Sequence, residues 1–188
     1  VFSQVIASAF PHSGVSLSVA NLIEIMITFS DNTATDLCLS LAGGPAAVTR
    51  AMQELGVSAL TVDRSTGEIL EAFYGVAPGK NSLGDAVALM LSDPNRINAP
   101  RADFESDGLD QSTPRAMLSV LRKLRAGEAV SPESTAFLLG AMSRTTTKPE
   151  RLGLLLPKGT AVAHKTGTIG GVANEVGYIG LPSGDEFA

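Results

Sequence analysis

The strand signals of this chain are confined to its last part, and this asymmetry most limits the folds that it can adopt. Helix-like periodicity and helix caps recur from about residue 15 to residue 150, whereas both runs typical of strands lie within about residues 155–188. We therefore expect a single α/β domain of the α+β kind over residues 1–188. A mainly helical part is expected to precede part of an antiparallel sheet flanked by helices, whose other strands are missing.

Cap and turn residues predict where the helices begin and end. Ser18 is expected to cap a helix over residues 19–29, which is apolar on almost every side and is therefore predicted to be buried. Residues 61–70 and 92–111 lack periodicity and are interpreted as loops. Further helices are predicted from Thr33 to Leu41, from Pro45 to Leu55, from a capping-box-like Ser82-Leu83-Gly84-Asp85 to about Leu91, after Thr113-Pro114, and after Ser131-Pro132-Glu133.

The composition excludes several classes of function. The net charge of −5 provides no basic footprint for nucleic acid, and no apolar run reaches the length that spans a membrane. Cys38, expected to be buried, is the only cysteine, and His12 and His164 are the only histidines. These residues leave almost no ligands for a metal site of the His/Cys type, so we expect no metal and no cofactor.

The ends of the chain suggest a piece of a longer protein. The sequence begins without Met, inside what reads as a structured segment. It stops at Glu186-Phe187-Ala188, directly after a Pro182-Ser183-Gly184-Asp185 turn, where a partner strand is expected. We interpret the chain as a fragment, so the absence of a leader peptide is uninformative.

A cation, hydroxyl groups and glycines meet at the end of a predicted strand in residues 163–172. Lys165 and Gly167 should share the face of a pocket, because alternate residues of a strand lie on one face. Thr166 should then point toward the other face unless the strand twists, and Gly167 allows a ligand close to the backbone. Together with the Thr168 hydroxyl, these groups can bind a carboxylate and polarise a carbonyl group. Gly170-Gly171 is interpreted as a bend.

A second polar group, Ser30-Asp31-Asn32, interrupts the apolar helix far earlier in the chain. Three polar residues directly after a buried helix must be hydrogen-bonded or face a cleft, because unpaired polar groups are costly to bury. Asp31 is expected to have a structural role and to bond nearby backbone groups.

Ser-Asp-Asn after a helix and Lys-Thr-Gly on a late strand resemble two motifs of class A β-lactamases and penicillin-binding proteins. The similarity extends over residues 16–37, 110–117 and 164–168, in the order of that family. The resemblance implies a β-lactamase/DD-peptidase-like fold, a small-molecule substrate that is either a β-lactam or a peptidoglycan-like peptide, a monomer and a periplasmic or secreted location.

The resemblance also implies a mechanism, in which a serine opens a β-lactam ring and water hydrolyses the acyl-enzyme. Ser30 would relay a proton to the leaving nitrogen, and Asn32 would hydrogen-bond the side-chain amide of the substrate. The substrate carboxylate would be held by Lys165 and the Thr166 hydroxyl, beside Gly167. The backbone N–H of Thr168 would form half of the oxyanion hole.

Two departures from the family pattern leave the mechanism incomplete. No serine stands three residues before any lysine, so the Ser-x-x-Lys motif is absent and the nucleophile is expected upstream of Val1. When Asp63-Arg64 is aligned with the omega loop of the family, Thr66 takes the place of the general-base glutamate. Glu68, two residues later, is the candidate base, and residues 73–107 are longer than the family pattern.

Three functions therefore remain open. The first is β-lactam hydrolysis, and the second is a penicillin-binding or DD-peptidase-like acyltransferase, which the missing base would favour. The third is a non-catalytic module that only binds a ligand. The absence of a Ser-x-x-Lys motif from the upstream sequence would make the third the best interpretation.

Overall fold

The computed structural model describes residues 4–93, 95–147 and 151–188, so residues 148–150 and residue 94 of the predicted helical part lie outside the described residues. In the described ranges the helices come first and the strands follow, as predicted. The helices are α1 (Gln4–Ala9), α2 (Val19–Thr28), α3 (Asn32–Leu41), α4 (Pro45–Glu54), α5 (Thr66–Tyr74), α6 (Ser82–Ser92), the 3-10 helix η1 (Arg96–Asn98), α7 (Ala102–Glu105), α8 (Pro114–Arg125) and α9 (Pro132–Ser143). The strands are β1 (Ala161–Ile169), β2 (Val172–Gly180) and β3 (Glu186–Phe187).

The strands form an antiparallel sheet in the order β1-β2-β3. Lys165 pairs with Val176 across β1 and β2, and Ile179 pairs with Phe187 across β2 and β3, where the partner strand was predicted. The predicted bend between β1 and β2 is confirmed, because Gly170 and Gly171 have φ angles of +58° and +80° there. The mixed fold class is confirmed, whereas the extent of a single domain over residues 1–188 stays a prediction.

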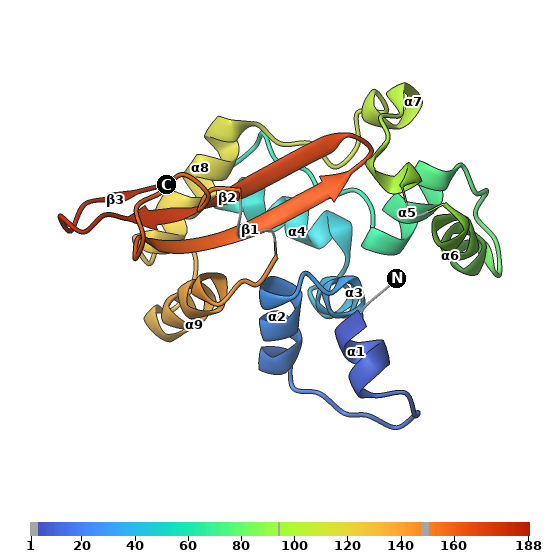
Figure 1. Ribbon diagram of the computed structural model, residues 1–188, viewed down its shortest axis with the longest axis horizontal. Helices are drawn as coiled ribbons and strands as arrows, with labels where there is room; N and C mark the ends of the chain where they lie inside the picture. Colours follow the sequence, from blue (N-terminus) through green and yellow to red (C-terminus); the bar gives the residue numbers. More distant parts are fainter. Residues whose placement is uncertain (1–3, 94, 148–150) are drawn as a thin grey trace.

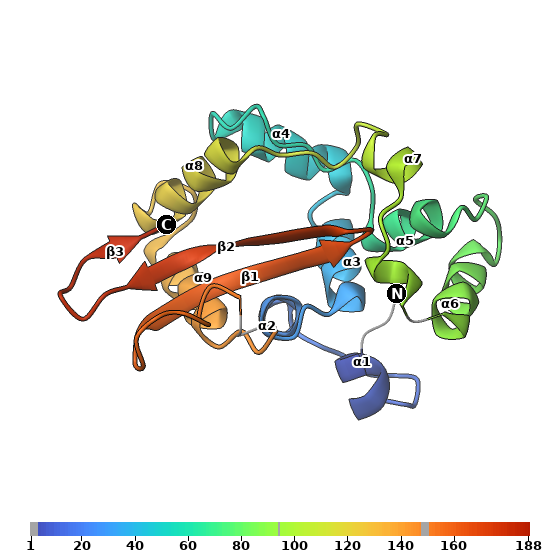
Figure 2. The same ribbon diagram turned by 45° about the horizontal axis from the view of Figure 1, so that its top comes forward.

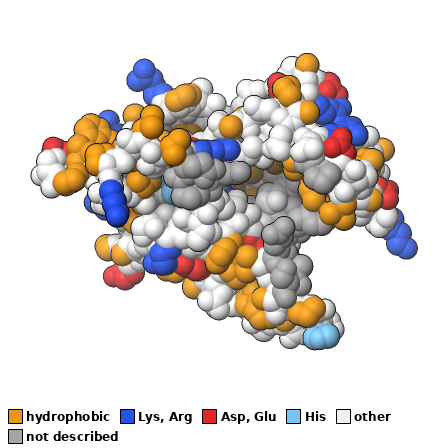
Figure 3. Space-filling view, in the orientation of Figure 1, with side chains coloured by type: hydrophobic (Ala, Val, Ile, Leu, Met, Phe, Trp, Pro, Cys, Tyr) orange, Lys and Arg blue, Asp and Glu red, His pale blue; other side chains and the backbone are white. Residues whose placement is uncertain are grey.

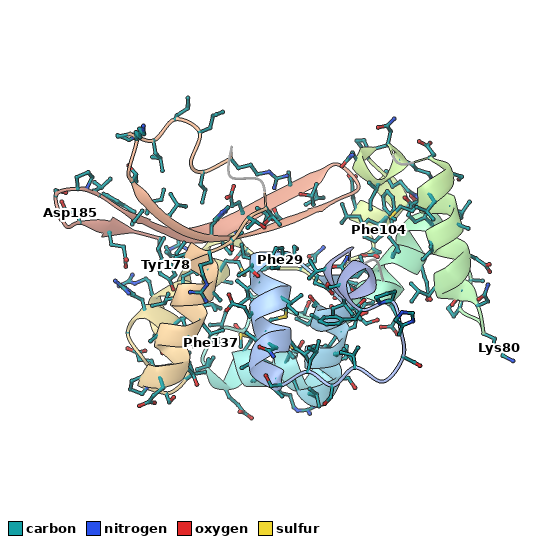
Figure 4. All side chains as sticks on the ribbon, turned by 60° about the horizontal axis from the view of Figure 1, so that its bottom comes forward. Phe29, Lys80, Phe104, Phe137, Tyr178 and Asp185 are labelled. Atoms are coloured by element: carbon teal, nitrogen blue, oxygen red, sulfur yellow. The ribbon has the colours of Figure 1, made fainter. Side chains whose placement is uncertain are left out.

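One apolar core joins the sheet to the helices α2, α8 and α9. Leu121, Met142 and Tyr178 are its buried members, and Tyr178 donates a hydrogen bond of 2.6 Å to the Leu121 carbonyl oxygen. Figure 4 shows Tyr178 on the side of the sheet that faces the helices. Figures 1 and 2 show the β1–β2 hairpin running along the molecule, with these helices beside one half of it.

A second apolar core lies at the turn of the hairpin. Figures 1 and 2 show α5 and α7 close to the end where β1 turns into β2. We call residues 66–109, which carry α5, α6, η1 and α7, the accessory unit. Arg64 stands at its base, with ion pairs of 2.8 Å to Asp107 and 2.6 Å to Asp110. The buried members of this second core are Leu70, Phe73, Tyr74 and Ala86.

Several predicted helix boundaries are confirmed by side-chain caps. The side chains of Ser18, Thr113 and Ser131 each accept a hydrogen bond from the backbone N–H three residues later. The predicted capping box at Ser82 is wrong, because Asn81 precedes the helix without a side-chain cap bond. Ser82 instead donates a hydrogen bond of 2.8 Å to a carboxylate oxygen of Glu71.

Other expectations are corrected by the packing. Residues 61–70 are not all loop, because α5 begins at Thr66, and short helices interrupt residues 92–111. The helix over residues 19–29 ends at Thr28 and is buried only at Leu22 and Thr28. Val19 is 53% exposed, so an apolar helix here presents part of its surface to solvent. Cys38 is half-buried rather than buried.

The surface charges, the helix lengths and the possible metal ligands show which kinds of partner the described residues could bind. On the face that Figure 3 shows, Lys and Arg side chains are scattered rather than gathered in one patch. Within residues 4–93, 95–147 and 151–188, no helix has the length and apolar character needed to cross a bilayer. The same residues contain no group of three or more His, Cys, Asp and Glu side chains that could hold a metal ion.

Candidate active site

Ser30 lies in the short connection between α2 and α3, in a conformation that L-residues rarely adopt. Its φ angle is +56°, and such left-handed non-glycine residues are enriched at functional sites because the surrounding structure must hold them. The next residue, Asp31, is 3% exposed and caps α3 by accepting a hydrogen bond of 2.9 Å from the Ala34 N–H. The structural role predicted for Asp31 is confirmed, and its cap holds Ser30 at the start of α3.

Lys165 on β1 reaches back to Ser30. Its Nζ atom donates hydrogen bonds to the Ser30 Oγ atom at 2.7 Å and to the Thr166 carbonyl oxygen at 2.6 Å. Burial of the amine lowers the pKa of Lys165 from 10.5 to about 8, because a partly dry site disfavours the ammonium form. The structure thus brings together two residues that the sequence nominated from separate motifs.

The hydroxyl of Thr166 takes the opposite side of the strand. It is buried and lies 2.9 Å from the hydroxyl of Thr147. This orientation follows the alternation of a strand, as the sequence predicted. Gly167, like Lys165, lines a cavity of about 730 Å³ between α8 and the sheet.

Arg151 adds a second cation near the end of β1. Its Nη2 atom donates a hydrogen bond of 2.8 Å to the Thr168 hydroxyl, and its Nη1 atom one of 3.4 Å to the Asn174 carbonyl oxygen. Sequence reasoning missed Arg151. It lies in a connection between a helix and a strand, where nothing local distinguishes it from a solvated surface cation.

A buried contact between His164 and Glu175 fixes the segment that carries Arg151. His164 Nδ1 forms a short hydrogen bond with Glu175 Oε1, and the two side chains are only 7% and 9% exposed. The second oxygen of Glu175 accepts a hydrogen bond of 3.2 Å from the Leu152 N–H. The sheet therefore holds the backbone directly after Arg151, which orients the guanidinium group toward Thr168.

Asn32 is the first residue of α3, close to the start of α5. Its carbonyl oxygen accepts a hydrogen bond of 3.3 Å from the Thr66 hydroxyl. Thr66 also donates from its N–H and its hydroxyl to one oxygen of Asp36, at 2.7 and 2.8 Å, and the Gly67 N–H donates to the other oxygen. Thr66, which aligns with the general base of the family, is therefore the first residue of α5, and its N–H and hydroxyl are both bonded to Asp36.

Glu68 takes part in a capping box. Its Oε2 atom accepts hydrogen bonds from the Ser65 N–H at 2.7 Å and from the Ser65 hydroxyl at 2.9 Å, and the side chain is exposed. These bonds, the backbone one first, lower the pKa of the Glu68 carboxyl. Glu68 is therefore a weaker base than an ordinary glutamate, and its partners lie in the cap of α5.

Comparisons with known proteins identify relatives of this chain. The PER-1 extended-spectrum β-lactamase of Pseudomonas aeruginosa is 30% identical over 95% of this chain and 50% of its own length. A β-lactamase of Mycobacterium tuberculosis is 30% identical over 92% of this chain and 48% of its own. The chain therefore spans about half the length of the curated relatives it matches.

Solved structures resemble the fold as well. The TLA-1 extended-spectrum β-lactamase has a TM-score of 0.72 at 27% identity, over 98% of this chain and 58% of its own. PBP-A has a TM-score of 0.66 at 27% identity, over 90% of this chain and 50% of its own. Residues 4–188 match the family model described as "Beta-lactamase enzyme family". The resemblance seen in the sequence is thereby confirmed, and the chain belongs to the β-lactamase enzyme family.

Proposed function

We propose that the protein containing these residues hydrolyses β-lactams through a serine acyl-enzyme. In this proposal the 188 residues contribute the proton relay and the substrate-binding side of the site. The observation that carries the proposal is the 2.7 Å hydrogen bond from Lys165 Nζ to Ser30 Oγ. Because the chain has no Ser-x-x-Lys motif, the nucleophile would come from residues outside it.

The relay follows from the direction of this hydrogen bond. Because Ser30 Oγ accepts a hydrogen bond from Lys165 Nζ, its own hydroxyl proton is available to another acceptor. When the serine nucleophile attacks and the lactam C–N bond breaks, the leaving nitrogen needs a proton, and Ser30 would deliver it. Lys165 would then return a proton to Ser30, and the proton that the serine nucleophile loses would restore the Lys165 ammonium. A pKa of about 8 makes this exchange accessible near neutral pH.

Substrate binding would rest on the cations at the end of β1. The Lys165 ammonium and the Arg151 guanidinium, which lies 2.8 Å from the Thr168 hydroxyl, would attract the carboxylate of a β-lactam. Gly167 would complete this side of the site, whereas the Thr166 hydroxyl, which lies 2.9 Å from the Thr147 hydroxyl, would support the strand instead of holding the carboxylate. Asn32 would hydrogen-bond the substrate amide. The Thr168 N–H would be one oxyanion donor, because β1 is an edge strand whose outer backbone groups are not used by β2.

A penicillin-binding acyltransferase is the second candidate, and the contacts of Glu68 favour it. Fast deacylation needs a base that activates water, and Glu68 is engaged in the cap of α5. A mutant of PBP-A, which resembles this chain in structure, has been solved as an acyl-enzyme complex with penicillin G. From the resemblance to this family we propose a periplasmic or secreted protein that is a monomer.

The proposed function is tested with the full-length protein and a chromogenic cephalosporin. We expect steady hydrolysis, with a transient acyl adduct that peptide mapping places on a serine outside these 188 residues. An adduct that accumulates supports the acyltransferase instead. A protein that shows neither hydrolysis nor adduct is a non-catalytic module, and that result overturns the proposal. The 188-residue chain alone is the matched control, which should hydrolyse nothing.

A further inference from the structure

The accessory unit packs directly onto the turn between β1 and β2. Ile169, the last residue of β1, belongs to the apolar core that Leu70, Phe73 and Tyr74 form within this unit. The Gly170 N–H donates a hydrogen bond of 2.8 Å to the carbonyl oxygen of Ile97 in η1. The turn is therefore held by both an apolar contact and a backbone hydrogen bond from a segment far away in the sequence.

The fit between the turn and the accessory unit explains the two glycines. A Cβ atom on Gly170 would lie 2.9 Å from the Phe73 ring, and one on Gly171 would lie 2.9 Å from the Pro100 side chain. Both distances are shorter than ordinary van der Waals contact, and both glycines have positive φ angles. The turn thus lies against the accessory unit with no room for a side chain at either position.

The accessory unit is packed well enough to hold the turn in place. Phe73 is fully buried, and its ring makes an edge-to-face contact with Phe104 at a centroid distance of 5.4 Å. Arg101 donates a hydrogen bond to the Phe73 carbonyl oxygen. Figure 4 shows Phe104 among the helices of this unit, beside the end of the hairpin. The contact therefore joins the turn to a small core of its own.

We propose that the accessory unit is a positioning element of the active site, with Phe73 and Ile97 as positioning residues. Thr168 directly precedes Ile169, so the anchor on Ile169 and Gly170 fixes the end of β1 that carries the oxyanion donor and the hydroxyl bonded to Arg151. This inference rests on the proposed function. Loosening the turn misplaces the Thr168 N–H, and a misplacement of about 1 Å lowers a catalytic rate by on the order of 10²-fold.

Two matched side-chain truncations, one on each side of the turn, distinguish a positioning role of the accessory unit from a general loss of stability. Ile169 and Val172 pair across the hairpin, but Ile169 packs into the accessory unit whereas Val172 is 39% exposed. In the full-length protein, Ile169→Ala should lower kcat by about tenfold or more with KM changed by less than about threefold. Val172→Ala should leave both constants unchanged.

A second pair of variants tests the contact with Phe73. Gly170→Ala places a methyl group against the Phe73 ring and should also lower kcat. Phe73→Leu removes the ring atoms that this methyl group meets, so the double variant should recover part of the lost kcat. A protein that is merely destabilised would lose activity further on the second change, and that result contradicts the positioning role.

Hydrogen exchange of the Gly170 amide gives a readout that does not depend on activity. Ile169→Ala should speed this exchange by about tenfold or more while amides of α8 and α9 exchange as before. Unchanged exchange, or an unchanged kcat in Ile169→Ala, overturns the inference while leaving the proposed function intact. A full-length parent that forms no acyl adduct instead overturns the proposed function, whatever the exchange shows.

Discussion

The Nζ atom of Lys165 lies 2.7 Å from the Oγ atom of Ser30, although 135 positions separate the two residues in the chain. One comes from an edge strand and the other from a strained connection between two helices. The hydrogen bond therefore joins the helical part of the chain to the sheet at the point where the proposed chemistry takes place.

Removing the Lys165 amine should slow acylation. A hydrogen bond to a charged group contributes about 1.5–3 kcal/mol, so Lys165→Ala in the full-length protein should lower the acylation rate by about 10- to 100-fold. Stopped-flow measurement with a penicillin gives this rate, and Lys158→Ala, at an exposed lysine, is the matched control. Equal rates in both variants would show that Lys165 is not part of the relay.

The depressed pKa of Lys165 predicts the pH dependence of activity. Burial disfavours the ammonium form, so the amine is charged below a pH of about 8 and loses its proton above it. Because the ammonium attracts the substrate carboxylate, kcat/KM for an anionic β-lactam should fall above about pH 8. Lys165→Arg keeps its charge at these pH values, so its residual activity should show no such fall. A profile of the parent that stays level to pH 9.5 contradicts this assignment.

The cap of α5 predicts that Glu68 is not needed for deacylation. Glu68→Gln in the full-length protein should clear a β-lactam adduct as fast as the parent, as followed by intact mass over time. Because Gln can also fill this position of a capping box, the free energy of unfolding should change by no more than about 0.5 kcal/mol. An adduct that the variant traps and the parent clears would instead identify Glu68 as the base.

The buried cap at Asp31 predicts a loss of stability on truncation. Asp31→Ala removes the acceptor for the Ala34 N–H, which should lower the free energy of unfolding by about 1–2 kcal/mol. Asp31→Ser keeps an acceptor and should lose less than half of that. Urea unfolding of the full-length protein measures both values, and equal losses would argue against the cap.

The sequence predicted the parts of the fold that neighbouring residues determine. Helix starts at Ser18, Thr113 and Ser131 were found because the cap and the N–H that it accepts lie three residues apart. The start of α5 differs from the loop predicted for residues 61–70, a prediction that rests on the absence of helical periodicity there. The apolar residues of α5 pack against Ile169, which lies about 100 positions later in the chain. No pattern within residues 61–70 therefore indicates this contact.

The same distinction applies to the candidate site. Ser30 and Lys165 were predicted because their residue types and motifs are visible locally, and the structure adds their contact. Arg151 and the His164–Glu175 pair depend on the path of the connection between α9 and β1, which no local pattern specifies. Glu68 was considered as a base from the sequence, whereas in the structure its carboxylate bonds to Ser65. This capping contact exists only because a helix begins at Thr66.

The ion pair between Arg64 and Asp110 closes a loop whose two ends meet in space although 46 positions separate them. Each doubling in the length of such a loop costs only about 0.6 kcal/mol of closure entropy. Chain can therefore be gained or lost between these ends in the course of evolution with little penalty to the framework. This junction is consequently a place where segments of different length can be exchanged, provided that the new segment keeps the contacts that Phe73 and Ile97 make with the turn between β1 and β2.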